Sequence, residues 1–236
     1  MVKNHLKRLN TPRTWNILRK ENKFIVRPNP GANNMELSVP ITVFFKELVK
    51  KAQTTKEVKF ILREKEVFVN GIRKRDNKVP VGFLDVISIP SIDDHYRILL
   101  SKKNKLFALP IDKKEADLLL LKIQNKILLG KDKIQLNFAN GFNLLVKKDT
   151  YKTGDSLVVS ASKRDILDHL PLQKGAKLLL FGGKHNGSFA TFEELKGDSL
   201  AVCKFDNNKG THDINKRFIL VVGKDKQVIT LEEKKK

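Results

Sequence analysis

The stretch that decides the fold is EVFVNGIRKRDNKVPVGFLDVISI, residues 66–89. It opens with the strand formers Val67–Val69 and continues with Asn70–Gly71, a pair that favours a tight turn whose residues need positive φ. Ile72 then begins a return strand. A second apolar run over residues 84–89 predicts another strand. The stretch therefore predicts a β-hairpin followed by a third strand.

Two helices are predicted just before this hairpin. Apolar residues recur at helical spacing over residues 41–52, with lysines and a glutamate on the opposite side. Thr54 and Glu57 have the spacing of a capping box, so a second helix should begin there and run to about Lys65. The order helix, helix, hairpin describes one small unit.

The net charge points to a polyanionic partner. The 236 residues include 47 Lys and Arg against 26 Asp and Glu, which gives +21, and 40% are hydrophobic, as expected of a folded chain. Such self-repulsion costs stability unless a polyanion offsets it. The cations are scattered, the opening residues 1–10 lack the apolar core of a signal peptide, and no apolar run is long enough to cross a bilayer. These features favour nucleic acid over a membrane and predict a soluble, intracellular protein.

Cations also gather around the predicted hairpin. A polar helix face is ordinarily charged, so lysines on the two helices alone would say little. A further run directly after the turn makes it more probable that clusters distant in sequence share one face. These residues are Lys46, Lys50, Lys51, Lys56, Lys59, Arg63, Arg73, Lys74 and Arg75.

Residues 1–37 form a basic arm in which apolar side chains alternate with the charges. Its candidate phosphate contacts are Lys7, Arg8 and Arg13. A solvated tail seldom carries the only Trp of a chain, so we expect the arm to lie on a surface. Trp15 either packs on the protein body or stacks on a base, and packing is the favoured interpretation.

The remainder is predicted to be rich in strands. Residues 95–170 should contain short strands, a helix over Lys113–Ile123 and a hairpin turning at Asn140–Gly141. Residues 175–205 consist of short strands around glycine turns, which suggests a small barrel. A further strand is expected over Phe218–Gly223, before a charged end.

No enzyme or metal motif is complete. The loop Gly182–Ser188 lacks the Lys that a phosphate-binding P-loop requires after its last glycine. Asp93, Asp94 and His95 are adjacent, and neighbouring side chains of an extended chain point apart. Cys203 is the only cysteine, which excludes an intramolecular disulfide and a cysteine-based zinc site. We therefore predict no catalytic residue, no metal and no cofactor.

Residues 66–89 and the preceding helices resemble an S-four-type RNA-binding domain. Gly182, Gly183 and Gly187 resemble a KOW motif, a glycine-rich loop that joins two barrel strands, although Ala190 replaces its third glycine. The whole order of parts resembles ribosomal family S4e of archaea and eukaryotes. The hallmarks of that family are matched by His5, Leu6, Lys7, Arg8, Pro12, Trp15, Phe24, Arg27 and Pro28, by Phe83–Ile89 with Leu84 in place of Met, and by Leu220–Lys224.

This resemblance implies an α+β, multi-domain chain. The expected parts are a basic N-terminal arm at 1–37, an S-four-type domain at 38–94, a β-rich central domain at 95–170, a KOW-like small β-barrel with a closing strand at 171–223 and a charged tail at 224–236. The implied function is that of a structural, non-enzymatic constituent of the small ribosomal subunit, in the cytoplasmic ribosome. The implied partners are small-subunit ribosomal RNA and neighbouring ribosomal proteins, with no membrane and no small-molecule substrate. To the RNA-binding residues named above we add Lys184 and His185, in the glycine loop.

Two alternatives stay open at this point. S-four-type domains also occur in RNA-modifying enzymes and aminoacyl-tRNA synthetases, which require a catalytic domain in addition. A free-standing RNA-binding or chaperone protein outside the ribosome is the second alternative.

Overall fold

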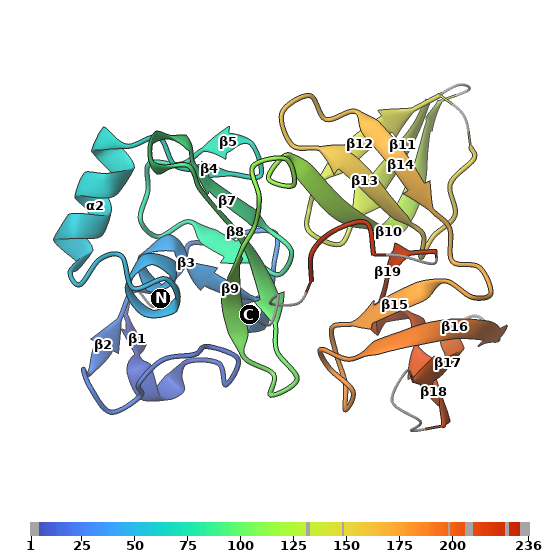
Figure 1. The fold of residues 1–236 in the computed structure, drawn as a ribbon, viewed down its shortest axis with the longest axis horizontal. Coiled ribbons are helices and arrows are strands. Elements are labelled where there is room, and N and C mark those ends of the chain that lie inside the picture. Colours follow the sequence, from blue (N-terminus) through green and yellow to red (C-terminus); the bar gives the residue numbers. More distant parts are fainter. Residues whose placement is uncertain are drawn as a thin grey trace. The chain divides into compact units, whose positions relative to one another are not determined.

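The protein is a mostly β, multi-sheet chain with two short helical segments (Figure 1). The computed structural model describes residues 5–130, 133–147, 149–197, 199–205, 210–224 and 227–231, so most of the expected charged tail lies outside the described residues. The chain divides into two compact units, Met1–Asp117 and Leu118–Lys236. The α+β expectation was therefore wrong in its balance, since strands supply nearly all of the regular structure.

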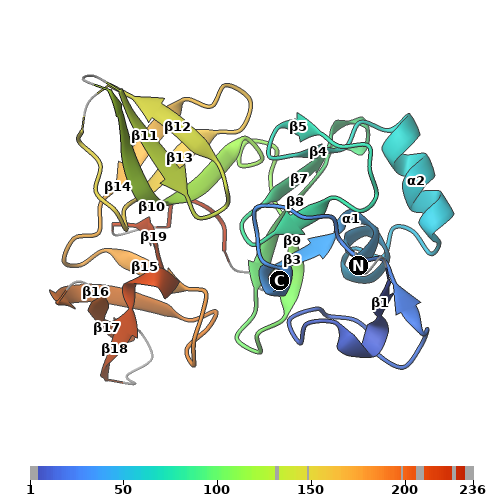
Figure 2. The ribbon, with the colours of Figure 1, turned by 180° about the vertical axis from the view of Figure 1, so that it is seen from behind.

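The first unit is built around a five-stranded antiparallel sheet of order β5-β4-β7-β8-β9, with two small two-stranded sheets, β1-β2 and β3-β6 (Figures 1 and 2). The sheet and the helical segments come from adjacent parts of the chain, as the hairpin stretch predicted. The elements are β1 (Leu6–Lys7), η1 (Arg8–Asn10), β2 (Phe24–Ile25), η2 (Met35–Leu37), β3 (Ser38–Pro40), α1 (Ile41–Val43), η3 (Phe44–Leu48), α2 (Thr55–Glu64), β4 (Phe68–Val69), β5 (Ile72–Arg73), β6 (Pro80–Gly82), β7 (Val86–Ile89), η4 (Pro90–Ile92), β8 (Asp94–Leu100) and β9 (Leu106–Pro110).

The two helical segments begin near the predicted positions. The first ends at Leu48 and is therefore shorter than the predicted range 41–52. Its α-turn, α1, passes directly into the π-turn η3, which ends at Leu48, and Lys50 then takes φ +57° and turns the chain. The second segment, α2, has the predicted capping box, because the hydroxyl of Thr54 accepts from the backbone N–H of Glu57 at 3.2 Å and the Glu57 carboxylate reaches back. Val58 and Leu62 bury the inner face of α2.

The core of the first unit lies between η3 and the sheet. Phe44 is fully buried, and its ring meets those of Phe45 and Tyr96 edge-on at centroid distances of 5.2 and 5.8 Å. Edge-to-face pairs of this kind add about 0.5–1.5 kcal/mol beyond the area they bury. The apolar spacing of residues 41–52 thus reports the face that packs on β8.

The basic arm is an integral part of this unit. Trp15 is fully buried, and its indole N–H donates to the carbonyl of Met35 at 3.1 Å, which confirms that it packs on the protein. The backbone N–H of Leu106 donates to the carbonyl of Thr14 at 2.8 Å, and the ammonium of Lys105 donates to the carbonyl of Trp15 at 3.4 Å. The arm is therefore attached through its backbone to the edge of β9.

The second unit contains two five-stranded antiparallel sheets, of order β12-β11-β10-β13-β14 and β18-β17-β16-β15-β19. In the latter, β18 and β19 are the two outer strands, so the pairing of the described strands is open and the sheet curls as a half barrel (Figure 1). The elements are β10 (Leu118–Gly130), β11 (Lys133–Phe138), β12 (Asn143–Val146), β13 (Ser156–Ser160), β14 (Ile166–Leu170), β15 (Lys177–Leu180), β16 (Phe189–Lys196), β17 (Leu200–Phe205), β18 (Thr211–Asn215), η5 (Lys216–Phe218) and β19 (Ile219–Gly223).

The predicted helix over Lys113–Ile123 is wrong. Residues 113–117 form turns, and the leucine run that follows is the start of the long strand β10. Successive residues Leu119, Leu120 and Leu121 are all buried, so this part of the strand is covered on both faces. A strand covered on both faces gives a continuous apolar run, whose periodicity does not differ from that of a buried helix.

A buried lysine links the two sheets of the second unit. The ammonium of Lys122, on β10, donates to the carbonyls of Lys216 and Arg217 at 2.7 and 3.0 Å. It also lies 5.4 Å from the ring centroid of Phe181. Burial lowers its pKa to about 7, with the nearby charge of Lys216 as a second cause. Lys122 therefore acts in the fold of this unit, not at its surface.

Candidate nucleic-acid interface

The β4–β5 hairpin is locked onto β7 by two buried polar side chains. Asn70 and Gly71 take φ +50° and +76°, as the turn prediction requires. The amide of Asn70 donates to the Asp85 carboxylate at 2.7 Å and accepts from the backbone N–H of Val86 at 2.8 Å. The second oxygen of Asp85 accepts from the backbone N–H of Gly82 at 2.6 Å. The Asn in this turn thus serves both the backbone conformation and the docking of the hairpin.

The burial of the Asp85 carboxylate shifts its pKa. Burial raises the pKa to about 6, and the hydrogen bonds from Asn70 and Gly82, together with the charge of Lys74, act in the opposite direction. The donors Asn70 and Gly82 thus partly offset the cost of burying this carboxylate. Asp85 does not line the pocket beside β2 or the pocket around residues 27–35.

Three predicted contacts lie together on the solvent face of α2. Lys56, Lys59 and Arg63 are all exposed, and their spacing places them in one stripe along the helix. In the part of the chain that the structure describes, none of them is paired with a carboxylate. This α2 stripe therefore presents three free cations.

The hairpin cations differ in how free they are. Arg73 lies on β5 and pairs with Glu66 at 2.9 Å, while Arg75 is exposed. Lys74 is half-buried, and its charge acts on the Asp85 pKa. Within the described ranges, the hairpin therefore adds one exposed arginine without a carboxylate partner, Arg75, one surface-paired arginine, Arg73, and one half-buried lysine, Lys74.

The cations of the first helical segment are also divided. Lys46 is half-buried on η3, and Lys50 is exposed at the turn with positive φ. Lys51 pairs with Asp94, and its ammonium lies 5.5 Å from the ring centroid of Tyr96. These partners raise the pKa of Lys51 against the effect of burial. Lys51 is held against the sheet, whereas Lys50 is available at the surface.

In the arm, the structure separates one predicted contact from the other two. Lys7 and Arg13 are exposed, as a phosphate contact requires. The side chain of Arg8 is only 4% exposed and pairs with Glu21 at 2.7 Å and with Glu47. The expectation that Arg8 contacts RNA phosphates at the surface is therefore corrected. Its guanidinium joins the arm to η3, because it pairs with Glu21 of the arm and with Glu47 of η3. These two carboxylates already neutralise its charge.

Lys184 and His185 lie apart from this cluster, in the loop between β15 and β16. Lys184 is exposed. His185 is half-buried, with its ring 4.7 Å from the ring centroid of Phe205 and 5.0 Å from that of His212. Sequence reasoning left the two other rings unassigned because they come from different strands. The loop carries a cation beside a small aromatic cluster.

Sequence reasoning missed exposed residues beside the predicted set. Phe60 is 64% exposed on α2, next to the α2 stripe, although most large apolar side chains of this unit are buried. Its position off the Val58–Leu62 face of the helix was visible in the sequence. Lys102 and Lys103 are exposed at the β8–β9 turn. All three enlarge the surface available to a polyanion.

The cluster Asp93 to His95 has a structural role. Asp93 sits in the left-handed region at φ +56°, and it is 3.4 Å from the ammonium of Lys113 and 3.5 Å from Nε2 of His95. Among the described residues, no three side chains of the types His, Cys, Asp and Glu are grouped to hold a metal ion.

No described helix has the length and hydropathy needed to span a membrane.

Comparison with known protein families gives two matches along this chain. Residues 92–166 match the model described as Ribosomal family S4e, and residues 2–36 match the RS4NT (NUC023) domain. The second match coincides with the basic arm that the structure ties to the first unit. The first spans β8 to the start of β14.

Similar proteins cover nearly the whole chain. The small ribosomal subunit protein eS4 of Methanocaldococcus jannaschii is 35% identical over 97% of this chain and 98% of its own length. The eS4 protein of Archaeoglobus fulgidus is 36% identical over 98% and 99%. The crystal structure of the 30S ribosomal protein S4e from Thermoplasma acidophilum superposes with a TM-score of 0.68 at 26% identity, and the match covers 79% of this chain and 95% of that one.

Proposed function

The chain belongs to ribosomal family S4e, and on this premise we propose that it holds small-subunit ribosomal RNA in place through its first unit. It is a structural, non-enzymatic constituent of the small subunit and acts in the cytoplasmic ribosome. Neighbouring ribosomal proteins are its other proposed partners. The exposed apolar side chains Ile127, Leu129 and Leu145 of the β10–β12 region support a protein contact on the second unit.

The observation that carries the RNA proposal is the α2 stripe. Lys56, Lys59 and Arg63 are exposed and free of carboxylate partners among the described residues, on a chain with a net charge of +21. Free cations release the counterions of RNA phosphates on binding, and the entropy of that release drives association. Lys50, Arg75 and Lys7 extend the proposed surface, whereas Arg8 does not belong to it.

The finer domain assignment is also proposed. Residues 38–94 contain the order helix, helix, hairpin and strand of an S-four-type domain, with the hairpin locked by Asn70. The glycine loop between β15 and β16 supports a KOW-like unit at 171–223, with Lys184 and His185 as its RNA contacts. Residues 1–37 serve as the arm, residues 95–170 as the β-rich centre and residues 224–236 as the charged tail.

Charge reversal on the stripe tests the proposal. The triple variant Lys56→Glu, Lys59→Glu, Arg63→Glu should lose association with small subunits in density gradients at moderate salt. The matched control reverses three exposed cations outside the proposed surface, Lys163→Glu, Arg164→Glu and Lys174→Glu, with the same change in net charge. If the triple and the control wash off equally, the stripe is not the interface. If the unaltered protein sediments free of small subunits, a non-ribosomal RNA-binding role replaces the proposal.

A further inference from the structure

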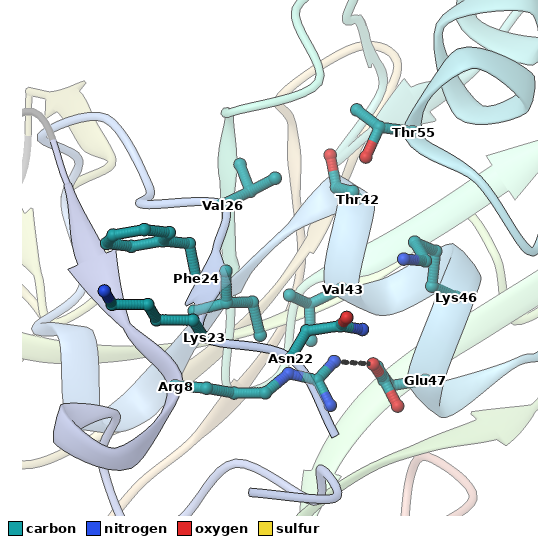
Figure 3. A pocket seen from close by; sticks show the side chains of 11 residues that line it. Arg8, Asn22, Lys23, Phe24, Val26, Thr42, Val43, Lys46, Glu47 and Thr55 are labelled. Atoms are coloured by element: carbon teal, nitrogen blue, oxygen red, sulfur yellow. Dashed lines mark hydrogen bonds and ion pairs between the residues drawn. The ribbon is translucent and has the colours of Figure 1, made fainter. Parts of the chain in front are cut away.

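The first unit contains a pocket of about 500 Å³ between the β2 segment of the arm and the helical segment formed by α1 and η3 (Figure 3). We call it the arm pocket. Figure 3 shows Lys23 and Phe24 on the β2 side of the pocket, and Val43, Lys46 and Glu47 on the helical side. The volume lies within the range of about 300–1,000 Å³ that small ligands occupy in proteins. None of the predicted contacts explains why this space is left open.

Arg8 and Asn22 both line the wall of the arm pocket. Arg8 is 3% exposed, and its terminal nitrogens bind Glu21 and Glu47. Its Nε has no hydrogen-bond partner among the described residues. This nitrogen is closed off from solvent, so an occupant of the pocket does not contact it. Asn22, which also lines the pocket, offers an amide that both donates and accepts.

The remaining lining fits a flat ring that is attached to an anion. Phe24 is 53% exposed and lines the pocket, with the ammonium of Lys23 5.5 Å and the ring of His5 5.7 Å from its ring centroid. Val26 and Val43 supply apolar contact area. Lys23 and Lys46 line the same pocket, and no described carboxylate pairs with either of them.

Resting on the proposed function, we infer that the arm pocket receives one unstacked nucleotide of the ribosomal RNA. The base stacks on Phe24, its edge pairs with the Asn22 amide, and Lys23 and Lys46 neutralise the flanking phosphates. RNA is recognised in this manner where a base leaves its helix and meets an aromatic side chain. The pocket is lined by more cations than carboxylates, since Glu47 is its one lining carboxylate. This excess of positive charge favours RNA as the occupant over a protein segment with few acidic residues.

Base-specific chemical probing of small-subunit ribosomal RNA, bound to the full-length chain, tests this inference. One unpaired base should be protected by the unaltered protein and become about tenfold more reactive with Phe24→Ala, in line with the loss of base–aromatic stacking. The matched control is Leu167→Ala, which removes a similarly exposed apolar side chain of the second unit, outside the pocket, and should leave that base protected. Asn22→Trp fills the pocket from an exposed position and should release the same base, with circular dichroism confirming the fold.

The outcomes separate this inference from the proposed function. If the unaltered chain protects no ribosomal RNA at all, the proposed function fails. If it protects RNA, and Phe24→Ala and Asn22→Trp leave every footprint unchanged, only the pocket inference is overturned. A benzophenone side chain placed at position 24 gives an independent readout within assembled small subunits. Crosslinking to a single nucleotide supports the inference, and crosslinking only to a neighbouring protein overturns it.

Discussion

The Asn70–Asp85 lock gives the sharpest prediction, through the substitution Asn70→Gly. Glycine keeps the left-handed backbone at φ +50° without strain, so the change isolates the loss of the side-chain amide. Two buried groups then lose their partners, the backbone N–H of Val86 and one oxygen of Asp85. Each such group costs about 1–3 kcal/mol, so the free energy of unfolding of the first unit should fall by about 2–6 kcal/mol.

The assay and its control follow from the structure. Trp15 is the only tryptophan, and it is buried in the first unit, so its fluorescence during urea unfolding reports that unit. Asn104→Gly is the matched control, since Asn104 also has positive φ, at +58°, but lies exposed in a turn. It should change the free energy of unfolding by less than about 1 kcal/mol. Equal losses for the two variants would refute the claim that the amide of Asn70 locks the hairpin.

Three further predictions concern charges. The folded-state pKa of Asp85 lies near 6, above its usual 3.8, so protonation of Asp85 stabilises the first unit. This stabilisation is complete below pH 3.8 and is lost as pH rises through about 6. The free energy of unfolding from urea titrations should show this pH dependence, and the variant Asp85→Asn should lack it. The pKa of Lys122 is lowered from 10.5 to about 7, so the second unit should gain stability as pH rises from 7 towards 10.5, and hydrogen exchange of β10 amides should lose this dependence in Lys122→Met. Arg8→Met leaves the half-buried Glu47 without its partner and should lower the free energy of unfolding of the first unit, measured by Trp15 fluorescence in urea, by about 1–3 kcal/mol. Arg13→Met, at an exposed position, should change it by less than about 0.5 kcal/mol, and equal effects would contradict the buried role of Arg8.

Locally encoded features were predictable from the sequence. The Thr54–Glu57 capping box and the Asn70–Gly71 turn depend on residues a few positions apart, and both form as predicted. The burial of Trp15 also followed, because a lone tryptophan in a basic arm needs a surface to cover it. The order of these parts was sufficient to indicate the family.

Tertiary structure decided the rest. The leucines of β10 are a strand because β11 and β13 pair with them, and no local signal distinguishes this from a buried helix. Arg8 leaves the RNA-binding set because folding brings Glu21 and Glu47 to it from 13 and 39 residues away. The arm pocket likewise exists only where β2 meets the α1–η3 segment. A sequence fixes which side chains carry charge, but whether a charge faces solvent or a buried partner depends on contacts between distant residues.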